Sequence, residues 1–409
     1  MNIGLWVRIG SRNIMRNKRR SLIMLMAMTI GLAGVIWFMG FMNAWLDQMV
    51  DNVIRSGNGQ MQIKAQGAFE RAGSTVGFDP QPALDVLEQH PELKAAQRVR
   101  GRGLLVGPNK SWPIQVVGID PPAEKQVSDW PQGELEGEYL KYDDHGKMLV
   151  GRKMVRRFDT RVGKKLVLYS QSMDASEDFG SGAFRIKGVY RSNSPELDDS
   201  TVFIALPEAQ SLFSLAGQVS EIAIIGAQDE LLAQTVDELR PAIEAAGLEI
   251  KSWRELSPMI VQMIEFSDKM MWIFYLVIFI AMAFGIINVL LIAVLERRRE
   301  FGVLRALGTP PQGLSFSIIF ESLSLALLAC LIGDAIGVLS VHYFHVHGLD
   351  LSYLAEGMEY VGMSAIVFFR VTVVDVLVAD AMLLLIVLLA SIYPAVKARR
   401  GRPAELLRS

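Results

Sequence analysis

A long polar segment enclosed between two apolar runs constrains this chain more than any other feature of its sequence. Four apolar runs cover residues 22–45, 270–295, 314–343 and 376–393. A bilayer core takes about 20 apolar residues to cross as a helix, so each run can span a membrane. Between the first and second runs lie residues 47–267, with the mixed, turn-punctuated composition of a soluble α/β domain. The sequence therefore predicts an integral membrane protein that holds one folded domain on one side of the bilayer.

Positive charge is concentrated in three of the segments that flank the apolar runs. It lies before the first run, between the second and third, and after the fourth, in Arg8, Arg12, Arg16, Lys18, Arg19, Arg20, Arg297, Arg298, Arg299, Arg305, Lys397, Arg399, Arg400, Arg402 and Arg408. The segment between the third and fourth runs carries Asp350, Glu356 and Glu359 against Arg370 alone. Because positively charged flanks stay in the cytoplasm, we expect cytoplasmic N- and C-termini and a large domain outside the cytoplasmic membrane.

Composition limits the class of protein. The chain is 51% hydrophobic with a formal net charge of −2, which fits a few spans plus a water-facing domain and gives no reason to expect a nucleic-acid partner. The first run is followed by no small-residue cleavage site, so we interpret it as a retained anchor instead of a signal peptide. The single cysteine, Cys330, lies in the third run, so the outer domain is expected to be stabilised by packing without disulfides.

The outer domain has the pattern of an α/β fold with two lobes. Strands are expected near residue 104 and at residues 59–65, 114–119, 147–150, 165–169, 184–190, 201–205, 221–225 and 248–251. Helices are expected at residues 82–89, 207–215, 229–245 and 252–266. One lobe would be mostly β, over about residues 95–200, and the other α/β, built from both ends of the domain. Residues 170–182, rich in glycine, serine and acids, are expected to form a loop or a projecting hairpin.

The fold class expected from these patterns is membrane α with an extracytoplasmic α/β domain. Its parts would be an interfacial helix (residues 1–20), a first span (21–46), the outer domain (47–267), a second span (268–295), a cytoplasmic segment (296–313), a third span (314–345), an outer loop (346–374), a fourth span (375–395) and a cytoplasmic tail (396–409).

The sequence gives no positive support for catalysis. No segment has the pattern of a phosphate-binding Walker A loop, because Gly146-Lys147 and Gly163-Lys164 lack its first glycine and its following hydroxyl. A nucleophile elbow and a zinc-binding helix of the two-histidine type are also missing. We therefore expect no catalytic residue, no metal site and no cofactor in this chain, and we do not expect it to be an enzyme.

The cytoplasmic segment at residues 296–313 is the strongest local signal. It places charges of both signs between two spans and continues with Gly308, Pro310 and Pro311. Such a segment can end one helix, form a short helix along the membrane and begin the next, which would give a cytoplasmic partner a lever to push. Composition alone is equally compatible with an ordinary charged loop.

This segment resembles the signature of FtsX/MacB/LolE-type ABC permeases. The matching residues are Arg299, Glu300, Phe301, Gly302, Arg305, Ala306 and Gly308. Further matches to that family follow in order along the chain: Arg12, Asn13, Arg16, Asn17 and Arg20 at the start; Gly118, Ile119, Asp120 and Pro121 in the outer domain; Glu321, Gly333 and Gly337 in the third run; and Pro394, Ala395, Ala398, Pro403, Glu405, Leu407 and Arg408 in the tail. The match covers the whole chain.

The resemblance implies a four-span permease of the type VII, mechanotransmission kind, with Porter-like and β-rich lobes outside the membrane. Two permeases, copies or paralogues, would bind a cytoplasmic ABC ATPase dimer that holds ATP and Mg²⁺. A coupling segment on that ATPase would include Glu296, Arg299, Glu300, Gly302, Arg305, Gly308 and Pro310. Replacing Glu300 or Arg305 should then uncouple ATPase stimulation from function.

Within the family, the chain is most similar to the LolC/LolE branch, which implies extraction of lipoproteins or other lipidic substrates from the outer leaflet of the bacterial inner membrane. The stretch at residues 171–183 contains no proline, unlike the LolC-type hook, which puts docking of a periplasmic carrier on this subunit in doubt. The alternatives are an FtsX-like signalling subunit that activates a cell-wall hydrolase and a MacB-like export permease.

A few polar residues within or beside the spans need a reason, since a charge at mid-bilayer costs about 2.5–3.5 kcal/mol. Glu321 is expected near the cytoplasmic end, paired with an arginine of the coupling segment. Asp334 is expected to face a dimer groove or to be protonated. The histidines at positions 342, 345 and 347 could form a metal site with Asp350, and interfacial belt residues are the preferred interpretation.

Overall fold

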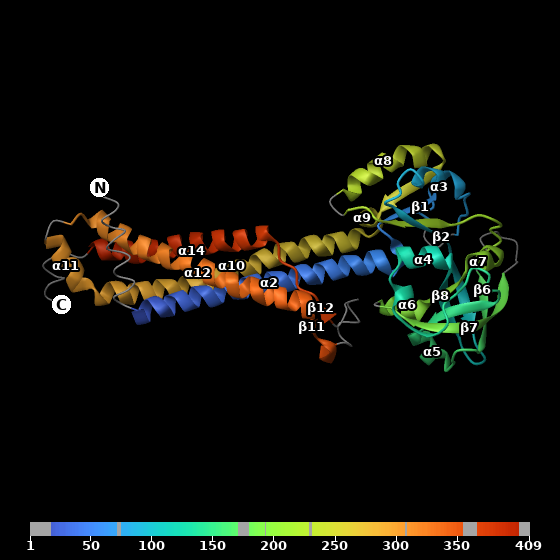
Figure 1. The fold of residues 1–409 in the computed structure, drawn as a ribbon, viewed down its shortest axis with the longest axis horizontal. Coiled ribbons are helices and arrows are strands. Elements are labelled where there is room, and N and C mark those ends of the chain that lie inside the picture. The colour runs from blue at the N-terminus through green and yellow to red at the C-terminus, as the bar shows by residue number, and fades with distance from the viewer. Residues whose placement is uncertain are drawn as a thin grey trace. The chain divides into compact units, whose positions relative to one another are not determined.

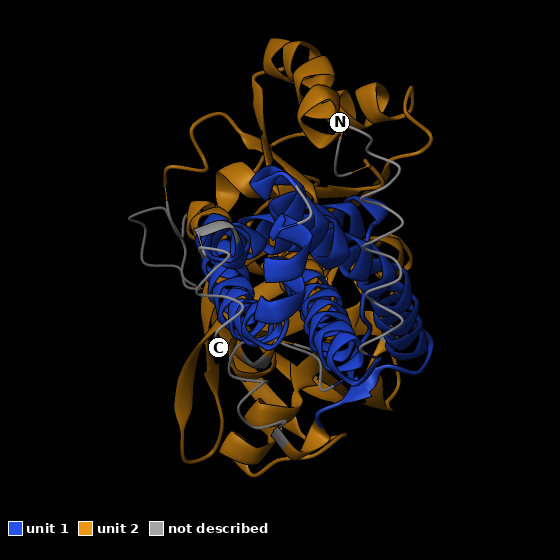
Figure 2. Ribbon diagram, turned by 90° about the vertical axis from the view of Figure 1, so that its left-hand side faces the viewer, with its two compact units in different colours: residues 1–46, 264–351, 366–409 blue, residues 47–263, 352–365 orange. Residues whose placement is uncertain are grey.

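The computed structural model describes residues 18–71, 75–170, 180–192, 194–228, 231–306, 309–354 and 366–400. The chain divides into two compact units (Figure 2). The helical unit comprises Met1–Leu46, Ile264–Leu351 and Ile366–Ser409, and the β-rich unit comprises Asp47–Met263 and Ser352–Ala365. The expected interfacial helix and most of the expected cytoplasmic tail lie outside the described residues.

The helical unit is built from the four apolar runs (Figure 1). Its long helices are α2 (Lys18–Val53), α10 (Pro258–Glu296), α12 (Pro311–His347) and α14 (Val373–Arg400), and its short helix is α11 (Arg298–Ala306). The 3₁₀ turn η3 (Ser352–Leu354) belongs to the β-rich unit. All four long helices are apolar enough to span a membrane. A short hairpin, β11 (Leu349–Asp350) with β12 (Ile366–Val367), follows α12. The expectation of four apolar helices is therefore confirmed.

Two glycines allow α12 to pack closely against α2. A Cβ atom at Gly337 would lie 2.9 Å from the Cβ atom of Ile36, and one at Gly333 would lie 3.0 Å from a methyl carbon of Leu32. Small residues let helix backbones approach, and this is how helices associate where lipid gives no hydrophobic driving force. The two glycines of the third apolar run thus serve packing inside one chain.

An aromatic cluster joins α2, α12 and the segment before α14. Trp37 lies with its ring centroid 5.0 Å from that of Phe369 and 6.2 Å from that of Phe344. Phe41 contacts Phe369 at 5.6 Å between centroids. His345 shares a hydrogen bond of 2.8 Å with the carbonyl oxygen of Phe369. This histidine therefore orders the end of the bundle.

Six strands of the β-rich unit pair in a closed cycle, in the order β2, β3, β8, β5, β7, β6 and back to β2. The strands of the unit are β1 (Met61–Ala65), β2 (Lys94–Val106), β3 (Ser111–Ile119), β4 (Glu134–Gly137), β5 (Lys147–Gly151), β6 (Lys165–Ser170), β7 (Ser181–Arg191), β8 (Thr201–Ala205), β9 (Glu221–Ile225) and β10 (Leu248–Ser252). Closure into a barrel removes exposed strand edges. All five residues of β8 are buried, as expected for a central strand.

The remaining strands extend the sheet from the barrel. Strand β2 pairs with β9 over its first residues and with β6 over its last ones. Beyond β9 lie β1 and then β10, which pair antiparallel so that Met61 faces Ser252. The strands expected in two separate lobes therefore belong to one hydrogen-bonded sheet, because β2 is long enough to pair with both halves.

Short helices cover this sheet and connect its strands. They are a π-helical turn η1 (Ile54–Asn58), α3 (Gln81–Leu87), α4 (Pro121–Val127), the 3₁₀ turn η2 (Trp130–Gln132), α5 (Arg152–Phe158), α6 (Pro195–Ser200), α7 (Leu206–Leu212), α8 (Leu232–Ala245) and α9 (Trp253–Leu256). The helix expected at residues 252–266 is divided at Ser257, since Pro258 starts α10. Of the loop or projecting hairpin expected at residues 170–182, residues 171–179 lie outside the described residues.

A buried ionic network holds the shared strand β2 in place. Arg98 is 1% exposed and donates two parallel hydrogen bonds of 2.8 Å to the carboxylate of Glu124 on α4. It also donates to the carbonyl oxygen of Gly57 and to the hydroxyl of Ser128. A second buried carboxylate, Glu221 on β9, lies 3.5 Å from the guanidinium. Fork-shaped pairing of this kind is the strongest form of the arginine–carboxylate interaction.

A buried carboxylic acid makes the β-rich unit sensitive to pH. Asp198 on α6 is 5% exposed and accepts hydrogen bonds from the backbone nitrogen (2.9 Å) and hydroxyl (2.7 Å) of Ser192. Burial raises the pKa of Asp198 to about 6, against the opposing effect of these hydrogen bonds. Because the pKa is raised on folding, the group's stabilising contribution is complete below its ordinary pKa and is lost as the pH rises through 6.

We expect Asp198→Asn to flatten this pH dependence. Between pH 4 and pH 7 the wild-type protein should lose about 1–3 kcal/mol of unfolding free energy relative to the variant, the size of a pKa shift of this kind. Thermal unfolding in detergent, followed by tryptophan fluorescence at several pH values, measures the difference. Asp143→Asn, at an exposed position in the same unit, is the control, and its stability should depend on pH as that of the wild type does. If the stability of Asp198→Asn also followed the wild-type pH dependence, Asp198 would not titrate in this range.

Candidate functional site

The expected coupling segment folds as a short helix between two spans. Helix α10 ends at Glu296, α11 covers Arg298–Ala306, and α12 begins at Pro311. The backbone nitrogen of Thr309 donates to the carbonyl oxygen of Leu304 at 3.0 Å, which closes the turn after α11. Helix α11 has Glu300 in its first turn and Arg305 in its last turn, the charge order that favours a helix dipole.

An aromatic anchor fixes the inner face of α11. Phe301 is 4% exposed and packs in one cluster with Val294 of α10, Leu314 and Ile318 of α12, and residues of α14. Its neighbour Gly302 is also buried. Burying a phenylalanine side chain is worth about 1.5–3 kcal/mol, so this contact holds α11 against the ends of three spans.

Glu321 is the ionic centre of the same region. It lies on α12, is 5% exposed, and accepts hydrogen bonds from Arg20 at 2.6 Å and from Arg297 at 3.4 Å. Arg297 also donates from Nε to the carboxylate of Glu300 at 3.0 Å. The side chains of Arg20 and Arg297 are 16% and 10% exposed. One carboxylate thus connects α2, the junction of α10 with α11, and α12.

The outward face of α11 is formed by Arg299, Val303 and Ala306. All three are exposed, Val303 to 48%. Their spacing of four and three residues places them on one side of a helix, opposite the buried Phe301. This face carries a cation beside apolar surface, which suits contact with another protein.

The structure separates the residues expected in the coupling segment into three groups. Glu296, Arg299 and Pro310 are exposed; Arg305 is half-buried; Gly302 is buried, and Glu300 is paired with Arg297. Gly308 lies outside the described residues. Arg20, Phe301 and Val303 were not predicted as site residues, although Phe301 stands inside the motif and Arg20 ends the first basic cluster. Arg297 is the arginine of the segment that pairs with Glu321.

Asp334 lies where α12 passes α14. Its carboxyl group interacts with that of Asp380 on α14. One carboxylate oxygen of each is buried without a hydrogen-bond partner among the described residues. Asp375, in contrast, accepts hydrogen bonds from the backbone nitrogen of Thr372 at 2.9 Å and from Asn43 at 3.0 Å. The hydroxyl of Thr372 accepts in turn from the backbone nitrogen of Asp375 at 3.2 Å, so the two residues form a capping box at the start of α14. The bond from Asn43 joins α14 to α2.

The histidines after the third run make local contacts. His347 shares a hydrogen bond of 3.0 Å with the carbonyl oxygen of Tyr343 and stacks on that ring at 4.4 Å between centroids. Among the residues that the structure describes, no group of three or more histidines, cysteines and acids is arranged to hold a metal ion.

The sequence matches two known domain families in tandem. The model of the MacB-like periplasmic core domain matches residues 21–242, and that of the FtsX-like permease C-terminal domain matches residues 272–403. The first match spans the first apolar run and most of the β-rich unit. The second spans α11 and the other three apolar runs.

Curated relatives cover most of the chain at low identity. The lipoprotein-releasing system transmembrane protein LolE of Haemophilus influenzae is 23% identical over 79% of this chain and 79% of its own length. LolC of Neisseria meningitidis, from a system of the same name, is 22% identical over 77% of this chain and 78% of its own. The macrolide export ATP-binding/permease protein MacB of Bdellovibrio bacteriovorus is 20% identical over 98% of this chain and 61% of its own. The crystal structure of the periplasmic region of MacB from Actinobacillus actinomycetemcomitans covers 49% of this chain and 91% of that one, with 15% identity and a TM-score of 0.36.

Proposed function

Because this chain belongs to the type VII family of FtsX-like ABC permeases that carry a MacB-like periplasmic core domain, we propose that it couples ATP hydrolysis by a partner chain to movements of its extracytoplasmic domain. The family resemblance of its motifs is confirmed by both domain matches. The ATP and Mg²⁺ would be bound by the partner. The permease would act in the bacterial inner membrane, with both termini in the cytoplasm and the β-rich unit in the periplasm.

The observation that supports this proposal best is the ionic centre at Glu321. A partner that pushes on α11 needs a rigid connection from α11 to the spans, because a loose loop would absorb the stroke. Phe301 supplies an apolar connection and the Glu321–Arg297 pair an ionic one. Arg20 extends the ionic connection to α2. A displacement of α11 is thereby passed to α2, and α2 leads directly into the β-rich unit through η1.

The outward face of α11 is the proposed contact with the ATPase. Val303 would enter an apolar pocket of the partner, and Arg299 would meet an acidic rim, an arrangement common in protein interfaces. Glu300 has a different role, because its carboxylate already holds Arg297. An ATPase dimer requires two such faces, so a second permease, either a copy or a paralogue, would complete the assembly.

Lipoproteins of the outer leaflet are the proposed substrate. The support is the names of two relatives that match more than three quarters of the chain, LolE and LolC, both from lipoprotein-releasing systems. Extraction toward the outside fits a chain with a large domain between its first and second spans. Docking of a periplasmic carrier on this subunit is not part of the proposal, because residues 171–183 lack the proline of the LolC-type hook.

Purification from the native membrane tests the proposal directly. The tagged full-length chain would be isolated in mild detergent and everything bound identified by mass spectrometry. An ABC ATPase together with acylated lipoproteins supports extraction, and a second permease in the sample would show a heterodimer. An ATPase with a cell-wall hydrolase and without lipid cargo would favour a signalling subunit and overturn the proposed substrate.

We expect Val303→Asp to separate this permease from its ATPase. A carboxylate forced into an apolar contact costs several kcal/mol, so recovery of the ATPase with the tagged chain should fall about tenfold or more. Val303→Thr keeps the shape of the side chain and should retain the ATPase. Both variants should elute as wild type in size-exclusion chromatography of the permease alone, since Val303 is exposed. Wild-type recovery with Val303→Asp would show that the ATPase binds elsewhere.

A further inference from the structure

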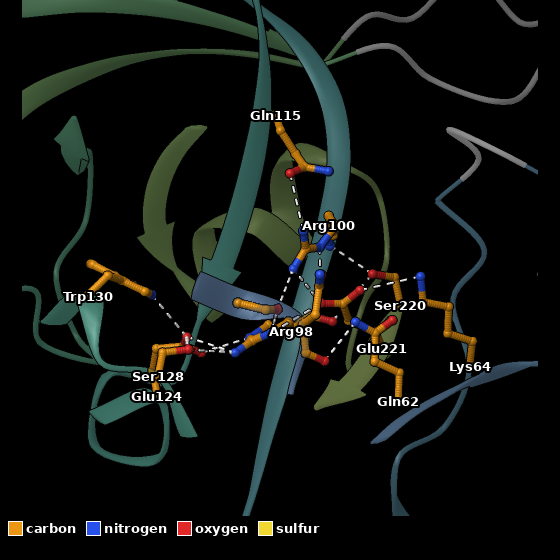
Figure 3. Close-up of polar contacts among 12 residues, drawn as sticks. Gln62, Lys64, Arg98, Arg100, Gln115, Glu124, Ser128, Trp130, Ser220 and Glu221 are labelled. Carbon is orange, nitrogen blue, oxygen red and sulfur yellow. Dashed lines mark hydrogen bonds and ion pairs between the residues drawn. The ribbon is translucent and has the colours of Figure 1, made fainter. Parts of the chain in front are cut away.

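We propose that the β-rich unit binds a phosphate group in a basic pocket beside strands β1, β2 and β9. The pocket has a volume of about 210 Å³. Lys64 of β1, Arg100 and Arg102 of β2, and Glu221 of β9 line it, with Phe69 and Gln115 at its walls. Figure 3 shows Lys64, Arg100 and Glu221 converging on one point between the strands. The inference concerns ligand binding alone and stands independently of the proposed function.

The charges of this region pair in a way that leaves a positive excess at the pocket. Behind it, the buried Arg98 is neutralised by Glu124 through two hydrogen bonds. Glu221 lies 2.9 Å from Arg100 and balances that guanidinium. Lys64 lies 3.5 Å from the same carboxylate. The residues that line the pocket include no further carboxylate that could balance Lys64 and Arg102. Arg71 also lines the pocket.

Arg100 is held rigidly in the wall of the pocket, and its partner Glu221 stays ionised. Arg100 donates to Glu221 (3.0 Å), to the side-chain oxygen of Gln115 (3.2 Å) and to the carbonyl oxygen of Gly57 (2.9 Å). Glu221 is fully buried, which by itself would raise its pKa, but the neighbouring Arg100, Lys64 and Arg98 hold the pKa at about 2. Glu221 therefore stays ionised at physiological pH.

The side chain of Arg102 is exposed and makes no hydrogen bond or ion pair within the described parts of the chain. Lys64 is held by an ion pair with Glu221 at 3.5 Å, so Arg102 is the more available of the two cations for a ligand. The ammonium group of Lys64 lies 5.1 Å from the ring centroid of Phe69, and that of Lys251 lies 4.9 Å from the same centroid. A guanidinium beside an ammonium is the donor set that recognises a doubly charged phosphate, because arginine can bind two oxygens at once.

A phosphate monoester is the class of ligand that fits best. Its two negative charges would balance Lys64 and Arg102, whereas a single carboxylate would leave one cation uncompensated. The volume admits the phosphate with a small attached group and is below the range typical of drug-sized ligands. That phosphate could be a free or sugar phosphate in solution or the headgroup of a lipid, and the experiment separates these sources.

The test is a titration of the full-length protein in nanodiscs of neutral phosphatidylcholine, with inorganic phosphate as probe and calorimetry as readout. We expect saturable binding with one site per chain. Arg102→Gln and Lys64→Gln should each weaken it at least about fivefold, the effect of removing one charge-assisted hydrogen bond. Arg161→Gln makes the same charge change at an exposed position of the same unit, outside the pocket, and should stay within twofold of wild type.

A second titration identifies the source of the phosphate. In nanodiscs containing phosphatidic acid, weaker binding of inorganic phosphate would show that the lipid headgroup occupies the pocket. Unchanged binding would assign the pocket to soluble phosphates. Absence of saturable binding in wild type under both conditions would overturn the proposal. An equal loss in Arg161→Gln would also overturn it, because diffuse positive charge would then explain the binding.

Discussion

Glu321→Gln is expected to loosen the base of the helical unit and to abolish coupling. The substitution keeps the size of the side chain but removes the charge shared by Arg20 and Arg297. Removing one partner of a buried ion pair costs about 3–5 kcal/mol, because the remaining charge stays buried without compensation. We expect a lower thermal unfolding midpoint in detergent, and stimulation of the copurified ATPase reduced more than tenfold.

Glu296, at the end of helix α10, provides a matched control. Glu296→Gln makes the same change at an exposed position and should leave the unfolding midpoint unchanged. Arg297→Lys keeps the charge and loses the geometry that allows one side chain to contact both Glu300 and Glu321, so it should give an intermediate loss of coupling at near-normal stability. If Glu321→Gln matched wild type in both measurements, the ionic centre would have no role in holding α11.

The second large effect is expected at Arg98. Arg98→Ala would leave the carboxylates of Glu124 and Glu221 buried close to each other with one cation fewer. We expect a loss of about 3–5 kcal/mol in the unfolding free energy, measured by denaturant titration with tryptophan fluorescence. Trp130 reports the change directly, because its indole nitrogen lies 3.3 Å from Glu124 and its ring stacks on Phe203 at 3.7 Å between centroids.

Arg102, on the same strand β2, supplies the comparison for the stability effect of Arg98. Arg102→Ala removes a guanidinium from the same strand β2, where it is exposed, and should change stability by no more than about 0.5 kcal/mol. Arg98→Lys should fall between the two, since an ammonium keeps the charge but cannot make the two parallel hydrogen bonds. Equal stabilities for Arg98→Ala and Arg102→Ala would mean that the buried network contributes nothing to this unit.

Local patterns in the sequence predicted the elements better than their arrangement. The four long helices follow from the length of the apolar runs, and β3, β6 and β8 follow from short apolar or alternating stretches. Barrel closure could not be predicted, because the pairing of β6 with β2 joins residues that lie far apart in the sequence. The short helices α4, α5 and α6 were missed, although α3 and α7, which are as short, were predicted. So few residues show little helical period, which makes helices of this length difficult to recognise.

The candidate site shows the same division between local and nonlocal information. Glu321 could be identified because a carboxylate inside an apolar run needs a partner. Arg20 could not be named as one of its partners, because the two residues are 301 positions apart. The motif identified the residues of α11 without their orientation. In the structure Val303, which the motif did not single out, faces outward, and Glu300 forms an ion pair with Arg297.

The pairing of β1 with β10 makes the β-rich unit a module. Its first and last strands lie side by side with Met61 opposite Ser252, and Cα atoms across an antiparallel pair are about 4.5–5.5 Å apart. The chain therefore enters and leaves the β-rich unit at nearly the same point, as it does in domains that tolerate transplantation into another protein. A gene encoding the helical bundle can exchange this insert for another with adjacent ends, keeping the same four helices while acquiring a new extracytoplasmic specificity.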